Sequence, residues 1–284
     1  MTTFGERLAA GLAERGPLCV GIDPHGGLLR SWGLDESSAG VREFGLRVVE
    51  AAVDRVAVVK PQVAFFERFG SAGFAALEEV MAAARAAGLL VIADAKRGDI
   101  GSTMDGYAAA WLEPGSPLEA DAVTLSPYLG PDSLHTTMNT ALRADKGVFV
   151  LAATSNPEAL AVQTALTVDP GSGDDESVAA RIAREIGARN VGMPGPLGSL
   201  GLVVGATVER RACGLSDVVL AGTPLLAPGF GAQGAEPRDL RTLFGYVSSA
   251  VIASESRSIL AAGPAAIADR IDERTALYRE ALGA

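Results

Sequence analysis

Short apolar runs alternate with longer amphipathic segments along almost the whole chain. The runs are rich in Val, Leu, Ile and Ala and are bounded by Gly, Pro or charged residues, which is typical of strands buried on both faces. They predict strands at residues 18–22, 56–62, 89–97, 122–127, 147–154, 200–205, 224–228 and 246–252. Apolar positions at helical spacing predict helices at 3–15, 39–54, 71–87, 102–112, 131–143, 175–189 and 264–282.

This alternation predicts an α/β protein with a single (β/α)8 TIM barrel and an additional N-terminal helix. Eight apolar runs in 284 residues fit one closed barrel better than a doubly wound sheet. We therefore expect one domain over residues 1–284. The rhythm breaks only at 155–177, which is polar and rich in Gly and Pro. Because the pattern resumes unchanged afterwards, we expect an insertion or lid loop there rather than a linker.

Charge enters the third apolar run at alternate positions. Asp94 and Lys96 are two residues apart in a predicted strand, so their side chains should share one face. Gly98 lets the chain turn, and Asp99 follows it. Taken alone, this pattern is equally typical of a structural Asp–Lys pair at a strand end. It also gathers three charges at the end of a parallel strand, where barrel enzymes keep their active sites.

Polar residues end several other strands. Asp23, Lys60 and Ser126 end the first, second and fourth, and Gly-rich or Ser-rich loops at 229–234 and 254–258 follow the last two. In a barrel these loops form the usual phosphate site, which Arg257 can complete. Residues 229–234 also match the dinucleotide pattern GxGxxG. That pattern should open the first βαβ unit and begin a helix, whereas this one follows the seventh strand and leads to Pro237.

Composition narrows the possible partners and location. The net charge of −10 argues against nucleic acid or an anionic membrane as a partner. Cys19 and Cys213 have neither a disulfide framework nor metal-ligand spacing. The N-terminus lacks the apolar core of a signal peptide, and no run is long enough to span a membrane. We expect a cytoplasmic protein. His25 and His135 match no catalytic pattern.

The motifs together resemble the orotidine 5′-phosphate decarboxylase family. Asp-x-Lys-x-x-Asp alone is shared with other barrels that act on sugar phosphates, but the full set in this order is specific. The long 155–177 segment resembles the larger bacterial subgroup. The matching segments are 21–24, 59–61, 94–103, 125–128, 227–234 and 256–259.

The resemblance implies decarboxylation of orotidine 5′-phosphate to uridine 5′-phosphate with no metal and no organic cofactor. Lys96 would stabilise and protonate the C6 carbanion, Asp94 would face the substrate carboxylate, and Lys60 and Asp99 would complete a charge network. The other implied contacts are those of Asp23 and Lys60 with the ribose, Ser126 and Pro127 with the pyrimidine, and Gln233 and Arg257 with the phosphate. In the family Asp99, Ile100 and Thr103 reach the neighbouring subunit's site, which implies a homodimer.

Two alternatives compete with this interpretation. A metal-dependent sugar-phosphate decarboxylase or aldolase shares the Asp-x-Lys-x-x-Asp motif but carries a metal-binding glutamate where the second strand here ends in Lys60. An ammonium at that position would repel a divalent cation. The other alternative is an inactive barrel that only binds nucleotides, although every charged member of the network is present. In isolation, Ser126 could be an ordinary strand-end serine and Arg257 a surface arginine.

Overall fold

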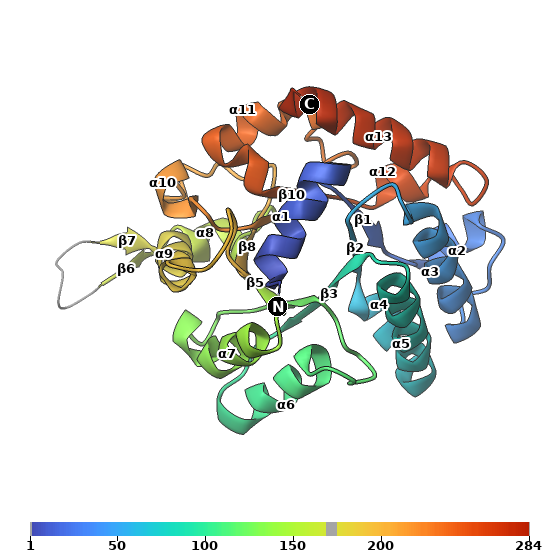
Figure 1. The fold of residues 1–284 in the computed structure, drawn as a ribbon, viewed down its shortest axis with the longest axis horizontal. Helices are drawn as coiled ribbons and strands as arrows, with labels where there is room; N and C mark the ends of the chain where they lie inside the picture. Colours follow the sequence, from blue (N-terminus) through green and yellow to red (C-terminus); the bar gives the residue numbers. More distant parts are fainter. Residues whose placement is uncertain (1, 169–174, 284) are drawn as a thin grey trace.

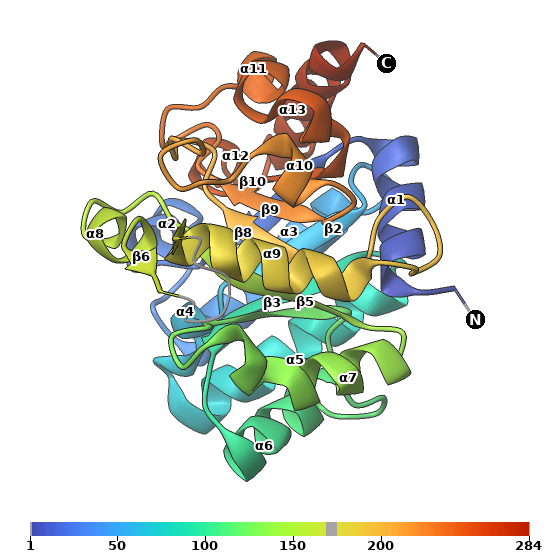
Figure 2. The same cartoon turned by 90° about the vertical axis from the view of Figure 1, so that its left-hand side faces the viewer.

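The computed structural model describes residues 2–168 and 175–283. Parallel strands form a closed barrel, and they follow one another around it in chain order, with the last pairing to the first. The predicted TIM barrel is therefore confirmed (Figures 1 and 2). The barrel strands are β1 (Leu18–Ile22), β2 (Val58–Pro61), β3 (Leu90–Arg97), β4 (Ala122–Leu125), β5 (Gly147–Ala153), β8 (Leu200–Val204), β9 (Leu225–Pro228) and β10 (Val251–Glu255).

Helices surround the barrel and cover its outer face (Figure 1). Their apolar sides pack on the strands in one large core that includes Phe44, Phe66 and Tyr278. The α-helices that connect strands are α2 (Gly26–Ser31), α3 (Ser38–Ala52), α4 (Val63–Glu67), α5 (Gly70–Ala86), α6 (Gly101–Leu112), α7 (His135–Arg143), α8 (Ala159–Gln163), α9 (Val178–Asn190), α10 (Asp217–Leu220) and α11 (Leu240–Phe244). Short 3-10 helices are η1 (Pro131–Leu134), η2 (Pro237–Asp239) and η3 (Gly245–Ala250). The last two α-helices along the chain are α12 (Arg257–Leu260) and α13 (Ile267–Leu282).

The additional N-terminal helix, α1 (Phe4–Arg15), closes one end of the barrel. Thr3 and Glu6 form a capping box that defines where it begins. Phe4, Leu8 and Leu12 then join a second core made of inward-facing strand residues, with the Phe4 ring edge-on to Phe149 at 6.1 Å. Because α1 covers the end where the strands begin, the opposite end is left for a site.

The eighth strand lies further along the chain than predicted. Residues 245–250 form η3, and β10 starts only at Val251, so the predicted strand at 246–252 is wrong in its bounds. Tyr246 is 97% exposed and its backbone N–H donates to Asp217. A β-type composition therefore misled the prediction where the chain was still turning toward the barrel. The shift brings Ser254 and Glu255 into the barrel wall.

The described residues of the 155–177 segment, 155–168 and 175–177, form an arm that projects from the barrel (Figure 1). The arm contains α8 and an antiparallel pair, β6 (Leu166–Thr167) with β7 (Glu176–Ser177). The predicted insertion thus has secondary structure of its own, and its residues 169–174 lie outside the described residues. The short helices α2 and α4 were also not predicted, because each is too short to show a helical period.

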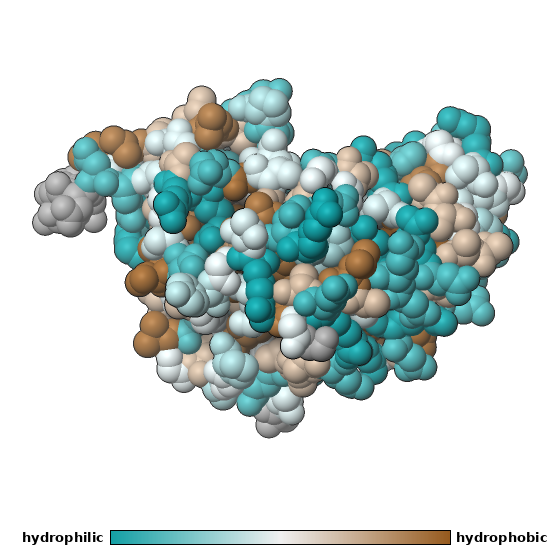
Figure 3. Space-filling model, turned by 90° about the horizontal axis from the view of Figure 1, so that it is seen from above, coloured by the Kyte–Doolittle hydropathy of each residue, from teal (hydrophilic) through white to brown (hydrophobic). Residues whose placement is uncertain are grey.

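The surface above α11 and α13 is largely hydrophilic with scattered apolar side chains (Figure 3). Such scattered side chains are normal for a protein surface. Within residues 2–168 and 175–283, no helix is both long and apolar enough to cross a membrane.

An ionic cluster lies where β4 and β5 begin, at the closed end of the barrel. The Lys146 ammonium contacts Glu119 at 2.8 Å, and Arg85 contacts the same carboxylate at 2.8 Å. Burial alone would raise the pKa of Glu119, but hydrogen bonds from Lys146 and from the Gly115 backbone N–H, with the nearby positive charges, lower it to about 2 from its ordinary 4.5. The carboxylate is thus more acidic in the folded than in the unfolded chain.

We expect Glu119→Gln to lower the free energy of unfolding at pH 7 by about 1–2 kcal/mol, the scale of a hydrogen bond to a charged group. Because the folded pKa is depressed, this stabilisation is present above about pH 4.5 and is lost as the pH falls toward 2. Urea unfolding at pH 7 and at pH 3 measures it. The same substitution at the exposed Glu113 is the control. A Glu119→Gln defect that is equal at both pH values would contradict the assignment.

Candidate active site

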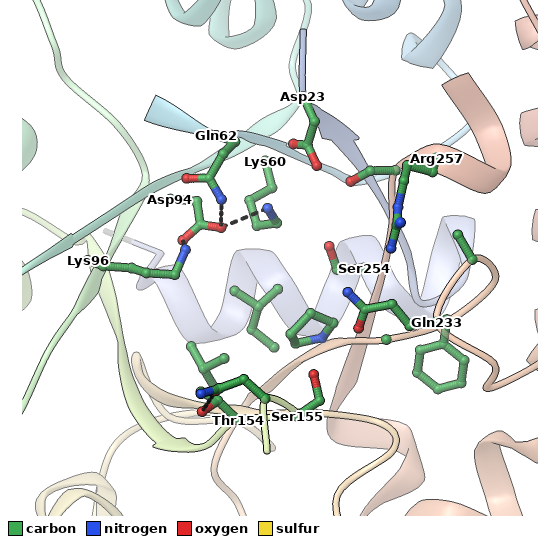
Figure 4. Close-up of a pocket in the computed structure, with 18 of the residues that line it drawn as sticks. Asp23, Lys60, Gln62, Asp94, Lys96, Thr154, Ser155, Gln233, Ser254 and Arg257 are labelled. Carbon is green, nitrogen blue, oxygen red and sulfur yellow. Dashed lines mark hydrogen bonds and ion pairs between the residues drawn. The ribbon is translucent and has the colours of Figure 1, made fainter. Parts of the chain in front are cut away.

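A cavity of about 460 Å³ opens at the carboxyl ends of the barrel strands, opposite α1 (Figure 4). Its volume is in the range of small-molecule sites. Polar groups from six strand ends converge on it, and Leu151, Val203 and Leu226 form an apolar floor. The polar lining consists of Asp23, Lys60, Gln62, Asp94, Lys96, Thr154, Ser155, Asn156, Gln233, Ser254, Ser256 and Arg257.

The Asp94 carboxylate accepts four hydrogen bonds, more than any other group that lines this cavity. Its Oδ2 accepts hydrogen bonds from Lys60 Nζ and Gln62 Nε2, both at 2.9 Å (Figure 4). Its Oδ1 accepts from Lys96 Nζ at 2.5 Å and from Thr124 Oγ1 at 3.0 Å. Four donors therefore occupy the carboxylate, and its position and orientation are fixed from both sides.

The two lysines differ in exposure. The Lys60 side chain is 6% exposed, whereas that of Lys96 is 44% exposed and open to the cavity. Burial alone would lower the pKa of Lys60, but attraction to Asp94 and Asp23 outweighs it and raises that pKa above its ordinary value. Burial alone would likewise raise the pKa of Asp94, but the charges of Lys60 and Lys96 hold it well below its usual range. Lys60 and Asp94 are thus both charged at neutral pH.

The backbone at Lys96 is strained. Its φ is +50°, a conformation that lysine rarely adopts, whereas the other two non-glycine residues with positive φ in the described chain are both aspartates. The pairing of β3 with β4 is irregular between Ala93 and Arg97. Thr124 on β4 holds this segment, because its buried hydroxyl accepts from the Lys96 N–H at 2.9 Å while donating to Asp94. Lys96 therefore meets Asp94 through a bulge rather than through plain strand alternation.

Asp23 and two loops form the other side of the cavity. Asp23 Oδ1 is buried and has no hydrogen-bond partner within the described residues, so it is an acceptor left over for a ligand hydroxyl. Arg257 and Gln233 project into the cavity from the loops after β10 and β9 (Figure 4). Gly229 and Gly231 have positive φ, which lets the second loop fold back so tightly that the Gly231 N–H reaches the Ala235 carbonyl at 2.7 Å.

The cavity contains six of the residues expected from the sequence: Asp23, Lys60, Asp94, Lys96, Gln233 and Arg257. Ser126 and Pro127 do not line it, and Ser126 instead receives the close approach of Gly98. Asp99 is half-buried and caps the Ile100 N–H at 2.8 Å. Ile100 and Thr103 are exposed and lie outside their own chain's cavity.

Several residues that line the cavity were not expected from the sequence. Thr154, Ser155 and Asn156 follow β5, and the strand-end rule that found Ser126 would have found them. Gln62 follows Lys60 by two residues, lies directly after β2 and lines the same cavity. Thr124 carried no signal, because a hydroxyl within an apolar run looks like packing, whereas Ser254 begins the Ser-rich segment 254–258 that the sequence did indicate. Across residues 2–168 and 175–283, no group of three or more His, Cys, Asp or Glu side chains is arranged to hold a metal ion.

Comparison with known proteins gives a consistent result. Residues 16–271 match the family described as "Orotidine 5'-phosphate decarboxylase / HUMPS family". The orotidine 5′-phosphate decarboxylase of Salinispora arenicola is 54% identical over 284 residues, covering 98% of this chain and 99% of the relative. A crystal structure from Streptomyces avermitilis, for which the same activity has been suggested, superimposes with a TM-score of 0.92 at 49% identity and covers 100% of this chain and 97% of that one. The Leishmania donovani OMP decarboxylase structure has a TM-score of 0.73 at 32% identity, with 98% and 99% covered.

We expect Asp94→Leu to lower the free energy of unfolding at pH 7 by about 3 kcal/mol or more, because it leaves the buried Lys60 ammonium without its main partner. Adding Lys60→Met should recover much of that loss, since the uncompensated charge is then gone. Chemical denaturation of the two variants measures the difference. Lys96→Met is the matched control and should cost about 1 kcal/mol or less, because that ammonium is part-exposed. A double variant no more stable than Asp94→Leu alone would show that the pair is not coupled in this way.

Proposed function

Because this chain belongs to the orotidine 5′-phosphate decarboxylase / HUMPS family, we propose that it converts orotidine 5′-phosphate to uridine 5′-phosphate and CO2. This reaction is the last step of de novo UMP synthesis, and we propose that it proceeds here without metal or organic cofactor. The observation that carries the proposal is Asp94 held between two ammonium groups in a cavity that has Arg257 and Gln233 on its far side.

The lining suggests how the nucleotide would lie. Arg257 and Gln233 would bind the phosphate, and Asp23 with Lys60 would bind the ribose hydroxyls, for which the unpaired Asp23 Oδ1 is available. The orotate ring then extends toward Lys96. Ser126 and Pro127 stay a prediction for the pyrimidine contact. Ser155 lines the cavity while neither of them does, so Ser155 is better placed for that contact.

Lys96 would carry the chemistry. Loss of CO2 leaves an electron pair on C6 in the plane of the ring, where no carbonyl can accept it, so the carbanion needs a nearby positive charge. A preorganised ammonium supplies that charge without reorganisation, in a reaction that needs roughly 20 kcal/mol of barrier lowering. The same ammonium is the proton donor to C6. Its exposure to the cavity and its contact with Asp94 support both roles.

Asp94 would lie against the reacting carboxylate. Its four hydrogen bonds prevent it from turning away, and its depressed pKa keeps it ionised at neutral pH. Repulsion between the two carboxylates is relieved as CO2 leaves, which favours the transition state over the bound substrate. Lys60 would offset the charge of Asp94 from the buried side.

We also propose a homodimer in which Asp99, Ile100 and Thr103 complete the neighbouring subunit's site. These residues lie beyond the end of β3 and outside their own chain's cavity. Exposed apolar side chains accompany them on the loops after β3 and β4, with Ile100 62%, Tyr128 87% and Leu129 53% exposed. A partner subunit would bury these side chains while bringing Asp99 to Lys96 of the other chain.

The competing activity in this family is metal-dependent chemistry on a sugar phosphate. Lys60 argues against it, because its ammonium occupies the position where a metal-binding glutamate would be needed, 2.9 Å from Asp94. A divalent cation there would have to approach a buried positive charge.

The proposed activity predicts that the purified protein consumes orotidine 5′-phosphate and releases uridine 5′-phosphate at an unchanged rate in excess EDTA. Lys96→Ala should lose at least 10²-fold in kcat, the lower range for general acid–base catalysis, and more if the ammonium also stabilises the carbanion. It should still bind uridine 5′-phosphate, because the phosphate and ribose contacts are elsewhere. Ultraviolet absorbance and calorimetry measure turnover and binding. Activity that EDTA abolishes would favour the metal-dependent alternative, and binding without turnover by the wild-type chain would favour an inactive barrel.

The shared site predicts complementation between two inactive variants. Lys96→Ala and Asp99→Ala homodimers should both be inactive, whereas a mixed dimer has one site with both residues intact. With random exchange half of the dimers are mixed, so about a quarter of wild-type site activity should return in a two-fold arrangement. The variants are unfolded and refolded together, and each is also refolded alone as a control. A mixture that forms dimers but stays inactive would place Asp99 in its own chain's site.

A further inference from the structure

We infer that Arg274 on α13 is a positioning residue for the substrate phosphate, because it ties together the two loops that carry Gln233 and Arg257. Arg274 does not line the cavity, so any effect on the ligand must pass through these loops. The inference rests on the proposed function to the extent that it takes those loops as the phosphate site.

The Arg274 guanidinium binds one carboxylate from each loop. Its Nε donates to both oxygens of Glu255, the last residue of β10, at 3.0 Å, and one terminal nitrogen, Nη2, donates to Glu255 Oε1 at 2.8 Å. Its remaining terminal nitrogen donates at 3.2 Å to Glu236, which follows the loop after β9. The planar fork of an arginine can bridge two carboxylates in this way, whereas a lysine is a single point charge.

We call the cluster of Arg274, Glu255 and Glu236 the clamp, and Glu255 is its most firmly held member. Its side chain is fully buried, and besides Arg274 it accepts hydrogen bonds from Tyr278 at 2.7 Å and from Ser258 at 2.5 Å. Arg257 is two residues beyond Glu255 and next to Ser258. A buried carboxylate requires such compensation, and here the compensating groups lie on α13 and at the start of α12. The backbone on both sides of Arg257 is thereby held to the C-terminal helix.

The loop after β9 fits closely onto the same cluster. A Cβ added at Gly231 would be only 2.4 Å from Ser258 Oγ and 2.8 Å from Glu255 Oε2. The neighbouring Phe230 packs edge-on against the Tyr278 ring, at 5.6 Å between centroids. The loop that carries Gln233 therefore rests directly on the residues that Arg274 organises.

The clamp has a functional consequence because the ligand-facing groups are themselves exposed. Arg257 and Gln233 both have exposed side chains, so their aim depends on the backbone that carries them. Fixing both loops on one helix sets the separation of the two phosphate contacts before the ligand arrives, which reduces the ordering cost of binding. Without Arg274 each loop keeps its residues but loses its position relative to the other.

The test compares Arg274→Met with Arg279→Met, the same substitution on the same helix at an arginine that contacts Glu14 of α1 instead. Steady-state kinetics are measured with orotidine 5′-phosphate and with orotidine, which lacks the phosphate. We expect Arg274→Met to lower kcat/KM for the phosphorylated substrate by about 10–100-fold, the scale of a misplaced binding group. Its kcat/KM for orotidine should stay within about twofold, as should both values for Arg279→Met. The affinity for inorganic phosphate should fall together with the first value.

A second variant tests the inference independently, in case Arg274→Met fails to fold. Glu236→Gln removes only the part-exposed arm of the clamp and should show the same selectivity at a smaller scale, about 2–5-fold, as expected for a part-exposed ion pair. Equal losses with both substrates, or no loss in Arg274→Met and Glu236→Gln, would overturn the inference. If the wild-type chain did not decarboxylate orotidine 5′-phosphate, the proposed function would fail. The inorganic phosphate affinities of wild type and Arg274→Met would still test the clamp.

Discussion

The buried carboxylate of Asp94 is the constraint on which the site depends. Removing a charge from water is expensive, and the cost is offset only where opposite charges and hydrogen bonds surround it. Here two ammonium groups, an amide and a hydroxyl from β2, β3 and β4 converge on one side chain. A closed parallel barrel brings these strand ends together, and it also holds the backbone strain at Lys96, which neighbouring Thr124 restrains.

The two ends of the barrel divide stability from function. At the closed end, α1 fills the interior with Phe4, Leu8 and Leu12, and the Glu119 cluster pairs its charges with one another. In that cluster Lys146 and Arg85 both bind the Glu119 carboxylate, although Arg85 Nε is buried without a hydrogen-bond partner in the described part of the chain. At the open end the charges are also paired, but Lys96 remains part-exposed and Asp23 retains a free oxygen. The closed end therefore consists mainly of packed apolar side chains and paired charges, whereas the open end presents Lys96 and Asp23 to the cavity.

The loops that carry Gln233 and Arg257, at the proposed phosphate end of the cavity, are subject to a different energetic constraint. Exposed loops adapt to a ligand but lose entropy when they order around it. The Glu255–Arg274–Glu236 cluster places a buried anchor directly beneath two such loops, and Gly231 lets one of them approach that anchor without a side chain in between. The charged centre and the phosphate loops are thus each held by buried ion pairs on opposite sides of one cavity.

The sequence by itself determined the barrel, because short apolar runs separated by amphipathic segments leave few other ways to bury both faces of each strand. It also identified Asp23, Lys60, Asp94, Lys96, Gln233 and Arg257, since charge at the end of an apolar strand is visible in one dimension. Tertiary structure alone decided the rest. Thr124, Gln62 and Arg274 are ordinary residues in their own segments, and their roles arise from partners 28, 32 and 19 residues away. The bulge at Lys96 and the late start of β10 likewise depend on neighbouring strands. The local sequence shows which side chains are apolar, but it does not show which strand the backbone will pair with.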